Sequence, residues 1–237
     1  MQISEIIKDS LVYPLNNVKS LIIYVIIGMV IGILGGASFY ALISQLASNN
    51  VLTAGGFGII GILITIIGAL LVSGYGLAIV KYGIERRDDA PGLNIVKQLS
   101  DAIKLIIVSI VYYIVPAIIA WLLYTLLGKG ILTVIFVAIM YIIFAFAQFM
   151  GVCRLSKYDS LGEAISISKA IEDVAKVGMI KIFITIAAVF IIGLIILLIF
   201  VAVFNYHQII GGLLLGIFGV YSVFFTNRAI GLLYSEV

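Results

Sequence analysis

One stretch decides the fold class, and it runs from Leu105 to Val152: LIIVSIVYYIVPAIIAWLLYTLLGKGILTVIFVAIMYIIFAFAQFMGV. It contains two apolar runs, residues 105–127 and 131–152, and its one charged residue is Lys129 in the turn between them. Each run has the roughly 20 apolar residues that a helix needs to cross a hydrocarbon core about 30 Å thick. The stretch therefore predicts two antiparallel membrane-spanning helices joined by a short turn.

The whole chain shares this composition. Of its 237 residues, 64% are hydrophobic and 11% are charged, whereas a soluble domain carries roughly 25% charged residues. The strands of a membrane barrel alternate apolar and polar residues, and the unbroken runs here favour helices instead. The net charge of +3 is too small to indicate a nucleic-acid partner. The single cysteine, Cys153, excludes an intramolecular disulfide and a cysteine-built metal site.

Six spans can be placed along the chain. They cover Leu21–Leu46, Phe57–Val80, Leu105–Leu127, Ile131–Val152, Ile180–Phe204 and Ile209–Leu233. Short polar or glycine-rich turns near residues 49–56, 128–130 and 205–208 separate the two members of each pair. We therefore predict an all-α polytopic membrane helical bundle of six transmembrane helices, arranged as three hairpins in a single domain over residues 1–237.

The positive charges predict the orientation. Every Lys and Arg except Lys129 lies before the first span, in the two long connections, or near the end of the last span. Cytoplasmic segments of membrane proteins carry an excess of these residues. We expect a multi-pass protein of the cell membrane with both termini in the cytoplasm and Lys129 outside.

A short amphipathic segment precedes each hairpin, within residues 3–15, 95–106 and 161–174. Each is expected to form a helix in the membrane interface, either as a connector resting on its own hairpin or as a lipid sensor. The segments share an echo: SEIIK at residues 4–8, SDAIK at 100–104 and SKAIE at 168–172. We therefore expect three internal repeats, over residues 1–84, 91–157 and 158–237.

Part of this pattern resembles a known family. Gly74-Tyr75, Lys81, Asp88-Asp89 with Pro91, and Ala102-Ile103-Lys104 resemble the uncharacterised prokaryotic membrane family called domain of unknown function 4013, which is common in methanogenic archaea. The resemblance covers most of the chain and is sharpest over about residues 70–120. Gly92-Leu93-Asn94 departs from the aromatic and glycine-rich patch expected after the proline. The resemblance implies a multi-span membrane protein and no particular activity.

Residues that could carry chemistry are scarce. His207 is the only histidine, so a site with two histidine ligands is excluded. All Asp and Glu residues fall outside the middle of the spans, where a proton or ion path would need them. The signature motifs of zinc proteases, serine hydrolases and phosphate-binding loops do not occur. We predict a protein without enzymatic activity, cofactor or metal.

Glycine and proline positions give predictions about the spans. Four-residue spacing puts Gly28 with Gly32, and Gly212 with Gly216, on one helix face, where small residues let helices approach closely. We expect these glycines to pack inside the protein rather than between copies of it. Pro116 should kink the third span and leave the carbonyl of Tyr112 without its usual partner.

Four tyrosines are expected at a depth similar to that kink. They either line a small polar pocket beside it or merely fill the core: Tyr112, Tyr113, Tyr141 and Tyr221.

Two functions from different classes fit these observations. The first is a non-catalytic membrane scaffold that interacts with lipids or with another membrane protein, including a second copy of the chain. It is favoured by the scarcity of chemistry and by the three interfacial segments. The second is a small transporter or channel-like protein for a neutral or lipid-like solute, which the repeats and the kinked span would suit.

Overall fold

The protein is built from helices α1 to α9, seen here in a computed structural model. Its backbone is described over residues 1–48, 51–206 and 208–237. Side chains are described over the same ranges except at positions 31–33, 35–37, 39, 51–54, 57, 200, 204, 206, 208–213, 215 and 216. The helices are α1 (Ile3–Asn16), α2 (Val18–Ala47), α3 (Val51–Ile84), α4 (Ile95–Leu127), α5 (Ile131–Tyr158), α6 (Leu161–Ala164), α7 (Ile167–Val177), α8 (Met179–Tyr206) and α9 (Gln208–Tyr234).

The long helices form the three predicted hairpins. Each predicted span lies within one of α2, α3, α4, α5, α8 and α9. Five helices are long and apolar enough to cross a membrane over the described residues, or six if α1 and the start of α2, which are bent by 76°, count as one broken span. Between α4 and α5 the turn is as short as expected, and Gly128 allows it because its φ of 71° suits a residue without a side chain.

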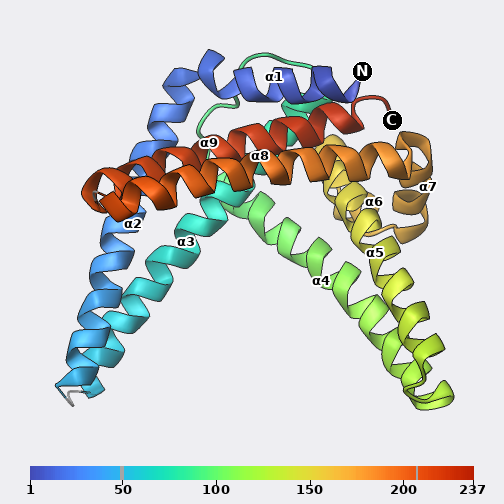
Figure 1. Ribbon diagram of the computed structural model, residues 1–237, viewed down its shortest axis with the longest axis horizontal. Helices are drawn as coiled ribbons and strands as arrows, with labels where there is room; N and C mark the ends of the chain where they lie inside the picture. The colour runs from blue at the N-terminus through green and yellow to red at the C-terminus, as the bar shows by residue number, and fades with distance from the viewer. Residues whose placement is uncertain (49–50, 207) are drawn as a thin grey trace.

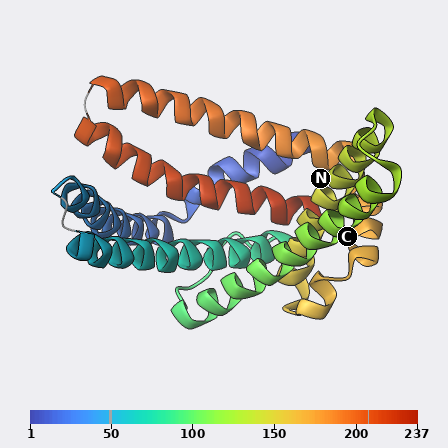
Figure 2. The ribbon, with the colours of Figure 1, turned by 90° about the horizontal axis from the view of Figure 1, so that it is seen from below.

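The three hairpins diverge from a common junction. Figure 1 shows α2 and α3 running down to the left and α4 and α5 down to the right, while α8 and α9 lie across the top. From below, α4 and α5 point the opposite way from the other two hairpins (Figure 2). The hairpins therefore do not form the single side-by-side bundle that we expected. In lipid no hydrophobic force drives helices together, so apolar faces alone do not hold them in a bundle.

Most buried side chains gather at the junction. We call this region the hub and define it as residues 1–16, 74–104, 147–178 and 220–237; the remainders of the three hairpins are the arms. Buried hydrophobic residues of α1, α3, α5, α6, α7 and α9 meet there in one continuous cluster, which extends beyond the hub to Val108 and Tyr112 of α4 and Ile182 of α8. A second cluster joins α1, α2, α3 and α9, and in it the rings of Tyr24 and Tyr75 stack with centroids 3.8 Å apart. Beyond Thr185, by contrast, no described residue of α8 is buried.

The amphipathic segments differ from the prediction in two ways. The second is not a separate helix: it forms the first turns of α4, which begins after Asn94 caps the amide of Lys97 and then continues into the span. The third is divided into α6 and α7 at Ile165 and Ser166.

These segments also do not rest on their own hairpins. α1 packs mainly on α9, the first turns of α4 meet α3 beside Gly74, and α7 packs mainly on α5. Each segment thus contacts the second helix of another hairpin, and the three contacts close a ring. The sharp bend after α1 turns that helix away from α2 and toward α9.

Candidate functional site

Three of the four predicted tyrosines line one cavity. Tyr112 and Tyr113 of α4 and Tyr141 of α5 border a space of about 290 Å³ together with Gln148. The Gln148 amide donates a hydrogen bond of 3.3 Å to the hydroxyl of Ser109. Polar groups therefore do meet between α4 and α5, but on the flank of one arm.

The tyrosine hydroxyls do not converge as a four-residue pocket requires. Buried Tyr112 donates a hydrogen bond of 3.0 Å to the carbonyl of Ala164 in α6. Tyr221 lies on α9 and donates one of 2.6 Å to the carbonyl of Leu11 in α1. Tyr112 and Tyr221 thus serve the hub, each fastening a short helix to a long one. Pro116 is buried, and α4 is continuous through it.

One of the predicted glycine packing sites is described. A side chain at Gly28 would meet Val220 of α9 at 3.5 Å, an ordinary packing distance. The other glycines of this prediction lie outside the residues whose side chains are described: Gly32, Gly212 and Gly216.

The closest helix approaches occur at other glycines, inside the hub. A Cβ on Gly231 of α9 would lie 2.3 Å from the carbonyl oxygen of Val80 and 2.8 Å from the Cα of Gly83, both on α3. A Cβ on Gly74 would lie 1.9 Å from the carbonyl oxygen of Gln98. Only glycine fits at these crossings, so the main chain of α3 packs directly against the main chains of both α9 and α4.

A buried ion pair joins α5 to α7. The Arg154 guanidinium donates a hydrogen bond of 2.8 Å from Nη1 to Asp173 Oδ2, and the two side chains are 7% and 3% exposed. Its other nitrogens bind Glu163, at the main-chain carbonyl and at the carboxylate. The hydroxyl of Tyr234 donates to the same Asp173 oxygen at 2.5 Å, which adds the end of α9 to the cluster. Hydrogen bonds from Lys169 and Arg154 hold the pKa of the Glu163 carboxyl below its usual value.

A second buried arginine joins α9 to α1. Arg228 is 2% exposed, and its Nε donates to Asp9 Oδ1 at 2.7 Å. It also contacts the Asp88 carboxylate at 3.2 Å and donates to the main-chain carbonyl of Arg87. Both buried arginines therefore hold an aspartate on an amphipathic helix and a main-chain carbonyl of a connecting segment.

The two aspartates occupy the same place in the sequence echoes. Asp9 follows Ser4 by five positions, as Asp173 follows Ser168, and Leu105 has this position in the remaining echo. Aligning the Lys-Tyr pairs at 81–82 and 157–158 likewise sets Ala78 opposite Arg154. At these positions the first hairpin and the segment after it carry Ala78 and Leu105, where the second hairpin and the segment after it carry Arg154 and Asp173. Extending the echoes by one residue would have revealed these aspartates from the sequence.

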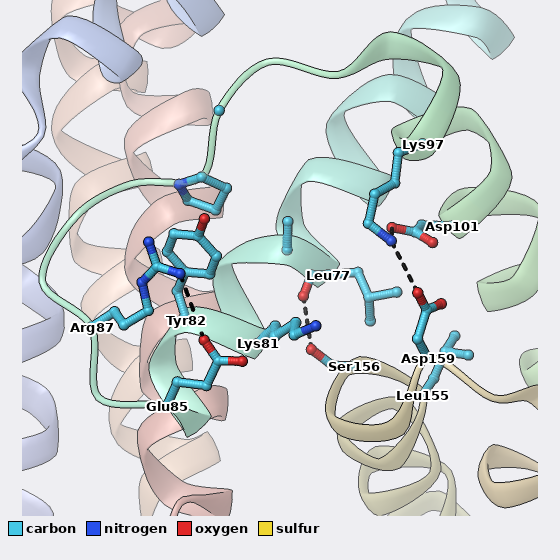
Figure 3. A pocket seen from close by; sticks show the side chains of 13 residues that line it. Leu77, Lys81, Tyr82, Glu85, Arg87, Lys97, Asp101, Leu155, Ser156 and Asp159 are labelled. Atoms are coloured by element: carbon cyan, nitrogen blue, oxygen red, sulfur yellow. Dashed lines mark hydrogen bonds and ion pairs between the residues drawn. The ribbon is translucent and has the colours of Figure 1, made fainter.

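A pocket opens on the hub between α3, the first turns of α4 and the end of α5 (Figure 3). It encloses about 320 Å³, and both cations and carboxylates line it: Lys81, Glu85, Arg87, Lys97, Asp101 and Asp159. The Ser156 hydroxyl fixes the floor by donating a hydrogen bond of 2.9 Å to the carbonyl of Leu77. Lys104 and Lys97 both bind Asp159, and their hydrogen bonds hold the pKa of its carboxyl below its usual value.

The described residues give no sign of metal chemistry. Within them, no three or more His, Cys, Asp and Glu side chains gather in a group that could hold a metal ion. Cys153 is fully buried among apolar neighbours in the hub. His207 lies outside the described residues.

Comparison with known families identifies the relationship of the chain. The sequence model of the family described as "Protein of unknown function (DUF4013)" matches residues 57–205, which is more than half of the chain. The chain belongs to this family, as the resemblance in its sequence implied. Comparisons with curated proteins and with solved structures find no match.

Proposed function

We propose that this DUF4013 family member is a non-catalytic membrane scaffold, which holds three hairpin arms apart on one polar hub and organises the lipids around them. The observation that carries the proposal is the contrast in packing between hub and arms. Ion pairs, close glycine crossings and most buried side chains lie in the hub. Beyond Thr185, in contrast, no described residue of α8 is buried, and the main neighbour of α8 is its hairpin partner α9. Arms of this kind leave long apolar faces for lipid or for another membrane protein.

Charge supports placing the hub at the cytoplasmic face. All Lys and Arg residues except Lys19, Lys129 and Lys181 belong to the hub. The two termini lie together in the hub, at one side of the molecule (Figure 1). Lys129 lies at the far end of the second arm. By the positive-inside rule, the hub and both termini are cytoplasmic and the arms enter the membrane of the cell from that side.

The ring of contacts in the hub supports three repeats. Each amphipathic segment packs on the second helix of another hairpin, and two of these contacts carry a buried Arg–Asp pair. We infer that the hub arose as three copies of one unit.

Lipid retention tests the proposed function. The protein released from its own membranes in a mild detergent should carry several lipids per chain by native mass spectrometry. Removing these lipids should lower its melting temperature, and adding them back should restore it, because the arm faces have few protein neighbours. A chain that retains no lipid, and whose melting temperature is the same with and without lipid, would contradict the scaffold.

A second candidate is a small transporter for a neutral solute. It is favoured by the cavity between α4 and α5, where Gln148 and Tyr141 place polar groups within the predicted span of α5 and Gln148 bonds Ser109 of α4. Its test is uptake of glycerol by vesicles that contain the protein. If the protein raises glycerol uptake and Gln148→Leu abolishes the increase, transport would replace the scaffold as the proposed function. If glycerol uptake is the same in vesicles with and without the protein, the transport function is excluded.

A further inference from the structure

Over the described residues, the hub pocket contains a cation without an ion pair, Lys81. Among the residues that the structure describes, the Lys81 ammonium group makes no ion pair and no hydrogen bond. Its side chain extends between Glu85 and Ser156, with the ammonium group toward the end of α5 (Figure 3). An ammonium group on a pocket wall without a partner can bind an anion without first breaking an ion pair.

The carboxylates of the same pocket are already paired. Asp101 and Asp159 each lie within 3.5 Å of both Lys97 and Lys104. Glu85 lies 3.8 Å from Arg87. These carboxylates are therefore screened by their own partners and oppose an incoming anion less than free carboxylates would.

Arg87 adds a second donor group to the pocket. Its guanidinium is stacked 3.8 Å above the ring of Tyr82 and is held on one edge by Asp89. This stacking fixes the guanidinium at the pocket wall. Its charge is paired with Asp89, but within the described part of the chain its Nη1 nitrogen, 3.8 Å from Glu85, makes no hydrogen bond and can donate one to an anion that Lys81 attracts. Lysine and arginine together are a common pair for phosphate oxygens, Lys as a point charge and Arg as a planar donor.

We propose that the hub pocket binds a phosphate group, with Lys81 as the principal contact and Arg87 as the second. The pocket lies where α3 leaves its predicted span, beside Tyr82, at the level where a cytoplasmic membrane surface would present its headgroups. The phosphate belongs either to an anionic lipid headgroup or to a free anion. If the phosphate belongs to a lipid headgroup, this inference rests on the proposed lipid-binding scaffold. If it belongs to a free anion, the inference is independent of the scaffold.

Binding of a short-chain lipid tests the site. The full chain in detergent is titrated with dioctanoyl phosphatidylglycerol by native mass spectrometry, alone and in competition with millimolar inorganic phosphate. Lys81→Gln should weaken binding about fivefold, the loss expected for one basic residue near an anionic surface. Lys81→Arg should keep the affinity. Lys19→Gln is the matched control, because Lys19 is exposed and lies outside the pocket.

Each outcome distinguishes the site from the scaffold. Competition by inorganic phosphate indicates a free-anion site, and lipid binding without competition indicates a headgroup site. Equal loss in Lys81→Gln and Lys19→Gln, or no loss in either, would overturn the site while leaving the scaffold intact. A chain that binds inorganic phosphate through Lys81 but retains no lipid would keep the site and refute the scaffold.

Discussion

Arg154 on α5 and Asp173 on α7 are joined by a hydrogen bond of 2.8 Å, and both side chains are almost fully buried. The pair connects the second hairpin to the amphipathic helix that leads into the third. Breaking a buried ion pair by removing one partner is costly because the other charge stays buried. The pair is therefore the part of the hub that a single substitution should affect most clearly.

Asp173→Asn should lower the free energy of unfolding by about 2–3 kcal/mol, since Arg154 then keeps only Glu163 as a charged partner. Thermal melting and denaturant unfolding in detergent measure this change. Glu172→Gln on the same helix is the control, because Glu172 is 63% exposed and its pair with Lys176 should matter little. Equal melting temperatures for the two variants would show that the buried pair does not hold the hub.

Gly231→Ala should destabilise the protein more strongly than Gly219→Ala on the same helix. A Cβ at Gly231 would meet main-chain atoms of α3 at 2.3–3.1 Å, whereas a Cβ at Gly219 would have nothing within 4 Å. Main chain cannot move aside as a flexible side chain can, so α3 and α9 must separate. We expect a loss of roughly 2 kcal/mol or more for the first variant. For the second, adding a methyl group in open space should be neutral or slightly stabilising.

The sequence was sufficient for the hairpins but not for their arrangement. The turn around Lys129 marks the second hairpin. Its three residues between two apolar runs are too few to connect the two helices in any arrangement other than an antiparallel pair. The divergence of the arms depends on contacts between residues far apart in the chain. Arg228 and Asp9, separated by 219 positions, are one such contact, and the sequence does not pair them.

In the candidate site, too, contacts within one hairpin could be predicted from the sequence and contacts between distant segments could not. Tyr112, Tyr113 and Tyr141 could be brought together by counting residues along antiparallel helices. The same count put Tyr221 at that depth, but its hydroxyl bonds Leu11 of α1, and the direction of α1 depends on the bend after Asn16. The hub pocket was missed because its lining comes from three segments that only the folded hub brings together.

Stability should fall in acid partly through Asp159. Lys104 and Lys97 lower the pKa of this carboxyl in the folded protein. Its contribution to stability is therefore present above the unfolded pKa of about 4 and is lost as the pH falls through the folded pKa. Melting curves between pH 7 and pH 3 should show a smaller acid-induced loss for Asp159→Asn than for the wild type. An identical loss in both would exclude Asp159 as a contributor.

Cysteine labelling tests the side on which the hub lies. Single cysteines at Arg86 and Glu163 should react with a membrane-impermeant maleimide only after the cells are opened, and one at Lys129 should react in intact cells. The reason is the concentration of Lys and Arg on the hub side of the spans. The native Cys153 is buried and should add little background. If the cysteines introduced at Arg86 and at Lys129 react from the same side of the membrane, the six-span topology is contradicted.

The most direct test of the scaffold is the distance between two arm tips in a lipid bilayer. Spin labels at Ser48, at the end of α2, and at Lys129, between α4 and α5, report this distance by pulsed electron resonance in nanodiscs. The helices of the two arms extend roughly 35 Å or more beyond the point where α3 and α4 meet, so diverging arms predict a distance above about 30 Å. Helices packed side by side lie about 8–10 Å apart. A narrow distribution below about 20 Å would show that the arms close into a bundle and would contradict the account.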